Sequence, residues 1–264
     1  MTAGPGTAGS PHRVSLPGGP EVWCTHVPAA VVMWREMLPP GAYHRAAAGL
    51  RDGGTLLDIG ANIGLMSLYC ARLRPGIRVI AVEPAPELHA CLERNLARHT
   101  TGAVAECLAV TDRPGLVRFT YYPGAPGNSG IRADREADDE ITRVFLRNTG
   151  VGPEDAEELL EGLHDGIELT VPAVTVSDLV RRYGLTRVDL LKVDVERAEL
   201  DVLRGVEPGH WPLIRSVVAE AHDENGRLAE LAGLLLAQGF EVSVHQDPLL
   251  SGTGLYDVEA RRPG

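Results

Sequence analysis

From residue 55 onward, the spacing of hydrophobic positions predicts strands that alternate with helices. Short apolar runs indicate strands over residues 55–59, 78–83 and 103–109. Apolar residues at helical spacing follow the first two runs, over residues 64–73 and 86–98. Strands that alternate with helices of this length are typical of a parallel sheet that is covered on both faces.

The alternation breaks between residues 131 and 168 and then resumes. The later pattern predicts extended chain over 167–176, a helix over 177–183 with Ser177 as its N-cap, a buried strand over 188–193, a helix over 199–204 ended by Gly205, a strand over 216–220, a helix marked by Leu228, Leu231 and Leu235, and strands over 241–245 and 255–260. We expect the last two strands to form a closing antiparallel pair. The whole pattern predicts an α/β fold with a doubly wound, mostly parallel sheet.

Residues 131–168 form a strongly acidic stretch with two weak helical patterns. The stretch holds 12 Asp or Glu and four Arg, a net charge of −8, whereas the whole chain of 264 residues carries −11. We interpret it as a helical insertion and a candidate lid within a single domain that spans residues 14–264. A lid of this charge would favour neutral or cationic ligands and would resist an acidic carrier protein.

The composition narrows the classes of partner. A net charge of −11 and a pI near 5.3 argue against a nucleic-acid-binding face, because such a face needs clustered Lys and Arg. No apolar run is long enough to cross a bilayer. Residues 1–13 are predicted to be a flexible tail, neither a signal peptide nor an anchor. We therefore expect a cytoplasmic protein with reduced Cys that acts on a small molecule, not on a membrane.

The clearest local motif is Asp-Ile-Gly-Ala-Asn-Ile-Gly, from Asp58 to Gly64, between a predicted strand and a predicted helix. Gly60 allows the chain to turn, Gly64 allows the helix to pack closely, and Asn62 tolerates a left-handed backbone. Glu83 ends the next strand, where a carboxylate can accept hydrogen bonds from both hydroxyls of a ribose. These residues predict a nucleoside site; alternatively, the glycines only make a turn and Glu83 only caps a helix.

The motif departs from a dinucleotide-binding loop. Such a loop prefers Gly-x-Gly-x-x-Gly, so that a pyrophosphate lies on bare helix N–H groups. Here Asn62 replaces the middle Gly, the third Gly is lacking, and the carboxylate of Asp58 precedes the first. This negative charge would repel a pyrophosphate but suits an ammonium or a sulfonium. Because S-adenosylmethionine carries both cations and a ribose, we expect it as the cofactor.

Several segments resemble one family of enzymes. Asp58 to Gly64 and Glu83-Pro84 look like motifs of class I S-adenosylmethionine-dependent methyltransferases. Residues 190–205, Leu-Leu-Lys-Val-Asp-Val-Glu-Arg-Ala-Glu-Leu-Asp-Val-Leu-Arg-Gly, closely resemble the signature of the FkbM-like methyltransferases. The resemblance covers roughly residues 30–260, and Asn128-Ser129-Gly130 also fits it.

This resemblance implies a fold and an activity. The fold is a seven-stranded sheet with an antiparallel C-terminal hairpin, and the activity is O-methylation of a secondary metabolite or a sugar. Arg197 departs from the family pattern, which commonly has Gly at this position. We therefore expect an altered loop there, with a guanidinium at the pocket.

Candidate catalytic residues gather at one edge of the predicted sheet. Methyl transfer from a sulfonium is an in-line displacement, so the acceptor oxygen must be aligned and its proton removed. Strand alternation places Lys192 and Asp194 on one face, and Glu196 follows at the carboxyl edge. Glu220 and His222 leave the next strand at the same edge.

Two mechanisms fit this convergence. In the first, Asp194 and Glu220 hold a divalent cation such as Mg²⁺, which lowers the pKa of the acceptor hydroxyl. Glu196 or His222 then takes the proton. In the second, without a metal, Lys192 and Asp194 form a buried pair that orients the loop, and His222 is the general base. Alternatively, these acids only line a solvated sheet edge.

Lys192 stands out because it is the single Lys in a chain with 24 Arg. A strand that keeps Lys under this bias indicates a need for a compact ammonium in place of a planar guanidinium. We expect Lys192 to be buried and paired with Asp194 or Glu220.

Weaker candidates lie outside these motifs. Glu36 and Tyr43 precede the first strand and are candidates to close over the methionine end, although such a Tyr is more often a packing residue. Asn128 fits either a cofactor contact or a turn. Asp112 lies either near the adenine or at the opening of a turn.

The sequence favours an S-adenosylmethionine-dependent O-methyltransferase that acts on a hydroxyl of a small natural-product or sugar-like acceptor. The alternatives are an NAD-dependent oxidoreductase, against which Asp58 and Asn62 argue, and a non-catalytic S-adenosylmethionine-binding protein.

Overall fold

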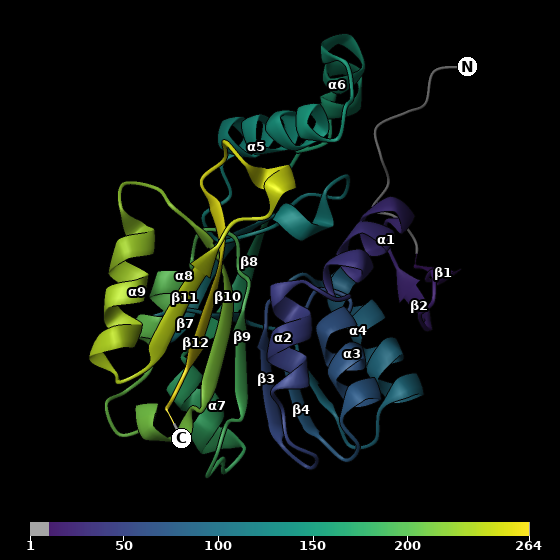
Figure 1. Cartoon of the computed structure of the whole chain (residues 1–264). Coiled ribbons are helices and arrows are strands. Elements are labelled where there is room, and N and C mark those ends of the chain that lie inside the picture. Colours follow the sequence, from purple (N-terminus) through teal and green to yellow (C-terminus); the bar gives the residue numbers. More distant parts are fainter. Residues whose placement is uncertain (1–10, 264) are drawn as a thin grey trace.

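The computed structural model describes residues 11–263, and within them a seven-stranded sheet forms the centre of the molecule (Figure 1). In spatial order the sheet contains β11 (Glu241–His245), β12 (Leu255–Arg261), β10 (Ser216–His222), β9 (Leu190–Val193), β3 (Thr55–Ile59), β4 (Arg78–Val82) and β5 (Val104–Glu106). β12 runs antiparallel to β10 and β11, and the other neighbours are parallel. The predicted sheet and its closing antiparallel pair are confirmed.

Helices cover both faces of this sheet, because residues along each strand alternate between two hydrophobic cores. On β3, Leu56 packs in one core, whereas Leu57 and Ile59 pack in the other. The first core includes residues of α1 (Val27–Glu36), α2 (Ala42–Ala48), α3 (Leu65–Leu73) and α4 (Pro86–His99). The second includes residues of α7 (Val176–Arg182), α8 (Glu199–Arg204) and α9 (Arg227–Ala237). The doubly wound arrangement is therefore confirmed.

A smaller sheet of three strands lies beside the main sheet within residues 11–263. Its order is β6 (Ala109–Val110), β8 (Ile167–Val174) and β7 (Gly115–Tyr121). The prediction of one strand over 103–109 was wrong, since β5 ends at Glu106 and β6 joins this second sheet. The chain changes sheet at Cys107, which is exposed. The sequence pattern of a short apolar run does not show whether its residues belong to one sheet or are divided between two.

The N-terminal segment adds a hairpin beside α4. β1 (His12–Ser15) pairs antiparallel with β2 (Glu21–Cys24), and the N–H of Trp23 donates to Asn95 Oδ1 at 2.7 Å. The predicted flexible tail, residues 1–13, lies mostly outside the described residues. His12 and Arg13, at the end of that tail, belong to β1.

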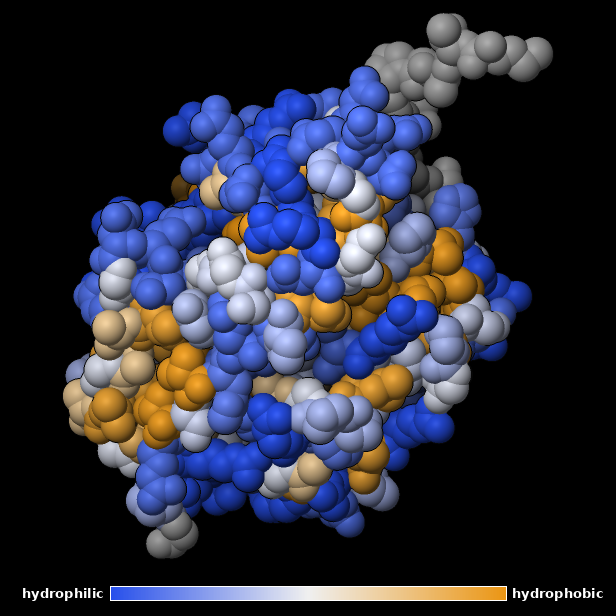
Figure 2. Space-filling model, turned by 45° about the horizontal axis from the view of Figure 1, so that its top comes forward, coloured by the Kyte–Doolittle hydropathy of each residue, from blue (hydrophilic) through white to orange (hydrophobic). Residues whose placement is uncertain are grey.

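The acidic insertion forms α5 (Arg135–Asn148) and α6 (Pro153–Leu160), beyond one end of the main sheet, at the top of Figure 1. Short 3-10 helices lie at Pro126–Asn128, Trp211–Leu213 and Pro248–Leu250. Figure 2, in which this top comes forward, shows mostly hydrophilic residues on the upper part of the molecule and hydrophobic residues below them. Among residues 11–263, no helix has the length and apolar character needed to cross a membrane.

The N-cap of α7 differs from the prediction. The helix begins at Val176, and the side chain of Thr175 accepts a hydrogen bond from the N–H of Asp178. Asp178 Oδ2 accepts in return from the N–H of Thr175 at 2.9 Å. This reciprocal capping box satisfies two N–H groups, so Thr175 is the N-cap and not Ser177. Ser177 is buried and accepts from the N–H of Glu207.

Candidate active site

A pocket opens at the carboxyl ends of β3, β4 and β9, with about 850 Å³ of empty space including its open mouth. Its polar lining includes Glu36, Gly60, Asn62, Glu83, Ser129, Lys192 and Asp194, and its apolar lining includes Met33, Met37, Leu108, Val110, Phe119 and Ile131. The pocket therefore joins the predicted nucleoside motif to the predicted catalytic edge in one space.

The loop after β3 has the backbone that the motif predicts. Gly60, Asn62 and Gly64 all have positive φ, at 71°, 51° and 90°. A Cβ on Gly60 would lie 1.7 Å from the carbonyl oxygen of Asp194, and a Cβ on Gly64 would lie 2.7 Å from Leu92. The two glycines therefore allow the loop to contact the chain after β9 and α3 to contact α4.

Glu83 links the end of β4 to this loop. Its Oε2 accepts from the N–H of Asn62 and its Oε1 from the N–H of Ala85, both at 2.9 Å. The side chain is buried within the pocket lining. Burial raises the pKa of Glu83 to about 7, although both hydrogen bonds oppose this shift. Each oxygen keeps a lone pair for a ligand, since a carboxylate oxygen accepts two hydrogen bonds.

Asp58 lies beneath the pocket and not in its lining. That the charge of Asp58 serves a cationic cofactor stays a prediction, and strand alternation turns Asp58 to the same face as Leu56, into the fold. There Oδ2 accepts from Ser67 Oγ at 2.6 Å, and Oδ1 lies 3.6 Å from Lys192 Nζ. The carboxylate is completely buried and therefore acts on its protein neighbours.

Lys192 is buried and paired with Asp194, as predicted. Its Nζ lies 3.2 Å from Asp194 Oδ2 and donates to the carbonyl oxygen of Gly60 at 2.6 Å. Although burial alone would lower the pKa of Lys192, the charges of Asp194 and Asp58 raise it. The ammonium thus connects the loop after β3 to the carboxylate after β9.

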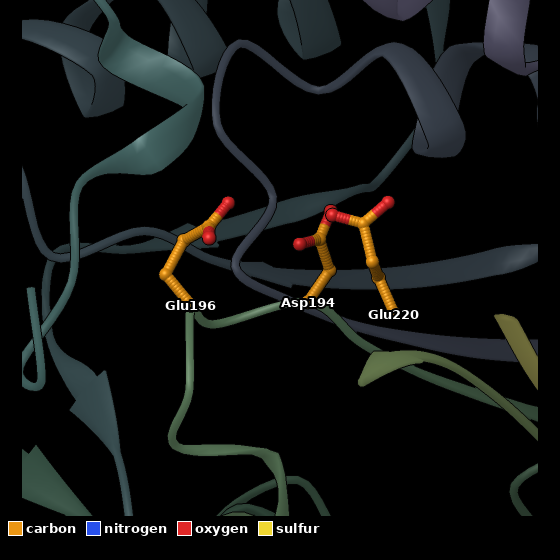
Figure 3. A group of neighbouring side chains, drawn as sticks. All are labelled: Asp194, Glu196 and Glu220. Carbon is orange, nitrogen blue, oxygen red and sulfur yellow. The ribbon is translucent and has the colours of Figure 1, made fainter. Parts of the chain in front are cut away.

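Three carboxylates gather at the carboxyl edge of the sheet, two after β9 and one on β10 (Figure 3). Oxygens of Asp194, Glu196 and Glu220 all lie within 4.8 Å of one another. Tyr43 Oη donates to Asp194 Oδ2 at 3.2 Å, so this weaker sequence candidate contacts the cluster. Of the three acids, Asp194 lines the pocket. The predicted convergence of Asp194 and Glu220 is confirmed, and Glu196 joins them.

Repulsion and burial change the charge state of this cluster. Burial and the negative charges of Asp194 and Glu196 raise the pKa of Glu220 well above its ordinary value. Glu36 lines the pocket but is exposed, and the surrounding pocket together with the charge of Asp194 raises its pKa. A proton or a cation is therefore favoured in this region near neutral pH.

His222 lies between two acids below the cluster. Its Nε2 is 3.2 Å from Glu196 Oε2, and its Nδ1 is 3.6 Å from Glu199 Oε1. Burial opposes a charged imidazole, but the two carboxylates outweigh it and raise the pKa of His222 well above its ordinary value. An imidazolium cannot accept a proton, so this geometry disfavours His222 as a general base.

Three other candidates are absent from the lining of the pocket. Asp112 is exposed, and Asn128 makes a turn by donating its N–H to the carbonyl oxygen of Ala125. Arg197 was expected at the pocket, but it is buried and directed to Asp138 on α5. None of these three belongs to the pocket lining among the described residues.

The apolar wall of the pocket was missed by the sequence analysis. Leu108 comes from the link between β5 and β6, Val110 from β6, Phe119 from β7, and Met33 from α1. Apolar side chains in short strands have the same pattern in a core and in a ligand pocket. These side chains line the pocket because the chain leaves the main sheet at Cys107 and enters the smaller one.

Comparisons with known proteins identify sequence relatives of this chain. The sequence model of the methyltransferase FkbM domain matches residues 58–242. The chain is 41% identical to 31-O-demethyl-FK506 methyltransferase FkbM of Streptomyces tacrolimicus, over 94% of this chain and 95% of that protein. It is 36% identical to methyltransferase sdnD of Sordaria araneosa, over 81% and 83%. A structure of methyltransferase FkbM from Methylobacillus flagellatus KT aligns with a TM-score of 0.49 and 15% identity, over 79% and 44%.

The family match spans more than half of the chain, and the Streptomyces tacrolimicus relative aligns along nearly its whole length. The oxidoreductase alternative is thereby set aside. The chain belongs to the FkbM family of S-adenosylmethionine-dependent methyltransferases.

Proposed function

We propose that this methyltransferase transfers a methyl group to a hydroxyl of a small natural-product or sugar-like acceptor. The observation that carries the proposal is one pocket whose lining includes both Glu83 and Asp194. A relative at 41% identity is named as a methyltransferase of 31-O-demethyl-FK506, a natural-product derivative.

The residues of the pocket fit S-adenosylmethionine. Glu83 offers carboxylate lone pairs for the ribose hydroxyls, and Leu108 and Phe119 offer an apolar wall for the adenine. Asp194 and Glu36 place negative charge at the end where an ammonium and a sulfonium would lie. When bound, the cofactor supplies an electrophilic methyl group. Asp58 supports this site indirectly, through Ser67 and Lys192.

We propose that Asp194 aligns the acceptor hydroxyl and that a carboxylate of the cluster takes its proton. Tyr43 and Lys192 hold Asp194 at the pocket wall. Burial and the neighbouring carboxylates raise the pKa of Glu220, so a proton is readily held within this cluster. An acceptor that fills the mouth of the pocket would also exclude water from the reacting oxygen.

A divalent cation is the second arrangement that the cluster supports. Asp194, Glu196 and Glu220 offer hard oxygen ligands of the kind that Mg²⁺ binds, and a cation would relieve their mutual repulsion. In that arrangement, the acids would hold the ion, and its charge would favour the acceptor alkoxide. Removal of divalent ions separates the two arrangements.

The first experiment tests cofactor binding. S-adenosylhomocysteine should raise the thermal midpoint of the purified protein, and NAD should leave it unchanged. Glu83→Gln should lose at least about tenfold in affinity for S-adenosylhomocysteine. A neutral amide has one acceptor oxygen in place of two, and its hydrogen bonds to the ribose hydroxyls are weaker than those of a charged carboxylate. Asp112→Asn, exposed and outside the pocket, is the matched control. Stabilisation by NAD alone would contradict the assignment.

The second experiment tests the acceptor atom and the metal. Labelled methyl transfer is measured with 31-O-demethyl-FK506, hydroxylated macrolides and sugars, each beside its O-methyl ether as a blocked control. Asp194→Asn should lower turnover about 100-fold even at saturating S-adenosylmethionine, which separates its effect on the reaction from its charge interaction with the bound cofactor. Loss of turnover with EDTA and recovery with Mg²⁺ would select the metal arrangement. Transfer to amines but not to hydroxyls would overturn the proposal.

A further inference from the structure

The chain after β9 holds two residues in an unfavourable backbone conformation. Glu196 and Arg197 have φ of 51° and 68°, the left-handed region in which a Cβ crowds the backbone. Neither residue has the freedom of Gly or the local hydrogen bonding of Asn. Surrounding contacts must therefore hold this conformation.

Arg197 supplies such contacts. The left-handed backbone directs its side chain away from the pocket, where it is only 2% exposed. Its Nη1 donates to Asp138 Oδ1, and its Nε donates to Glu224 Oε1, both at 2.5 Å. Asp138 lies on α5 and is 1% exposed, whereas Glu224 follows β10. One guanidinium therefore joins the insertion, the site loop and the end of β10.

The ion pair between Arg197 and Asp138 is buried, in contrast to a second ion pair that connects the insertion to the main fold. Arg132 also connects the insertion to the main fold, through Asp201 on α8 at 2.7 Å, but its side chain is half exposed. Solvent screens a pair of that kind, so its contribution is small. Loss of either Asp138 or Arg197 would leave a buried charge without a partner.

The same loop also supports the pocket wall. A Cβ on Gly130 would lie 2.9 Å from Glu196 Cβ and 3.1 Å from the Glu196 carbonyl oxygen, so Gly130 packs directly against Glu196. This segment provides Ser129 and Ile131 to the pocket and then leads into α5. The pocket wall, the carboxylate loop and α5 are thus in contact as one unit.

At its other end, α5 is fixed to the C-terminal strands. Asn148 Nδ2 donates to the carbonyl oxygens of Leu249 and Ser251, at 2.9 Å and 3.0 Å. The helix therefore spans from the site loop to the link between β11 and β12. Because α5 is held at both ends, we expect it to keep a fixed position over the pocket and not to open as a lid. We call α5 in this position the roof.

We propose that Arg197 is a positioning residue that clamps α5 to the loop of Asp194 and Glu196. Through this clamp it fixes the pocket wall formed by residues 126–131. The proposal concerns the placement of the roof and holds whichever atom the enzyme methylates.

Hydrogen–deuterium exchange of the full chain tests the clamp. Arg197→Gly suits the left-handed backbone, and Asp138→Asn preserves shape, so both variants are designed to fold. We expect amides of α5 to exchange at least about tenfold faster in both, with β3 and β4 unchanged, since release of the clamp opens α5 locally. The matched control, Arg132→Gln, should change α5 exchange less than about twofold, because its ion pair is half exposed.

Rescue separates positioning from general stability. Arg197→Lys keeps the charge and should restore most of the α5 protection that Arg197→Gly loses. Affinity for S-adenosylhomocysteine should fall in Arg197→Gly and Asp138→Asn, because the pocket wall that the clamp fixes includes Pro126, whose carbonyl oxygen accepts from Asn62 Nδ2 at 3.1 Å. Arg132→Gln should keep the parent affinity within about twofold. Unchanged α5 exchange in Arg197→Gly and Asp138→Asn would overturn the proposal. Equal acceleration in β3 and β4, or an equal effect of Arg132→Gln, would also overturn it.

Discussion

At the scale of single residues, Lys192 illustrates how a compositional oddity acquires a physical reason. Its ammonium lies among Asp58, Asp194 and the carbonyl oxygen of Gly60, in a space enclosed by β3 and β9. A compact cation can approach these three oxygens from one point. The guanidinium of Arg is larger and planar, and its N–H donors point in fixed directions, so it cannot approach the same three oxygens from one point.

Lys192→Arg should therefore weaken S-adenosylhomocysteine binding at least about tenfold, because displacement of Gly60 distorts the loop. Isothermal titration calorimetry measures the affinity. The reciprocal exchange at an exposed position, Arg118→Lys, is the control and should leave binding unchanged. Full affinity and turnover in Lys192→Arg would refute a special need for Lys.

Gly60→Ala tests the contact between the nucleoside loop and Asp194. Both strain at positive φ and the 1.7 Å approach to the Asp194 carbonyl oppose a Cβ there, so we expect a loss of at least about 4 kcal/mol in unfolding free energy. Gly53→Ala is the control, since Gly53 has φ of 65° and open space around its Cα. It should lose only about 1–2 kcal/mol. Urea denaturation gives both values, and equal losses would exclude the steric contribution.

Sequence spacing located most of the candidate site but not the direction of each side chain. Asp58 was correctly placed near the nucleoside loop, yet strand alternation turns its carboxylate into the fold. The left-handed backbone at Arg197 similarly directs its guanidinium to α5. Asp112 follows β6 closely but lies in an exposed turn. Spacing specifies an edge of the sheet, whereas backbone dihedrals decide which space a side chain reaches.

At the scale of elements, helices and strands with local signals were predictable and those defined by distant pairing were not. The glycine motif predicted the β3–α3 unit, and apolar periodicity predicted α4. β7 has no clear alternation, because it packs in a small sheet with Leu116 75% exposed. Its pairing with β8 joins residues about 50 positions apart. The pairing of β7 with β8 therefore cannot be predicted from the residues of either strand alone.

The N-cap of α7 yields a prediction at this scale. Thr175→Ala removes the hydroxyl that accepts from the N–H of Asp178, so the unfolding free energy should fall by about 1 kcal/mol. Thr101→Ala, at an exposed position, is the control and should change it by less than about 0.5 kcal/mol. Urea denaturation measures both. A neutral Thr175→Ala would mean that the capping box contributes nothing to α7.

At the scale of the whole molecule, buried carboxyl groups make stability depend on pH. Burial raises the pKa of Glu83 to about 7 and that of Asp257 to about 6. The folded chain therefore binds these protons more tightly than the unfolded chain does. The resulting stabilisation is complete below the ordinary carboxyl pKa values and is lost as the pH rises through 6 and then 7.

The thermal midpoint should accordingly fall between about pH 5.5 and about pH 8, in the absence of ligand. Glu83→Gln should reduce this slope, because the amide does not titrate. Asp112→Asn, whose side chain is exposed, should retain the parent slope. A midpoint that rises over this interval would show that the buried carboxyls do not control stability.

The position of β12 has a consequence for how the chain assembles. β12 lies inside the main sheet, between β10 and β11, although it follows all the other described strands in the chain. During synthesis, β10 therefore waits with an open edge until residues 255–261 emerge from the ribosome. A truncation before Leu255 would also separate β11 from the sheet, since β12 is its neighbour there. Nascent or shortened chains thus expose the strand that carries Glu220, a member of the carboxylate cluster.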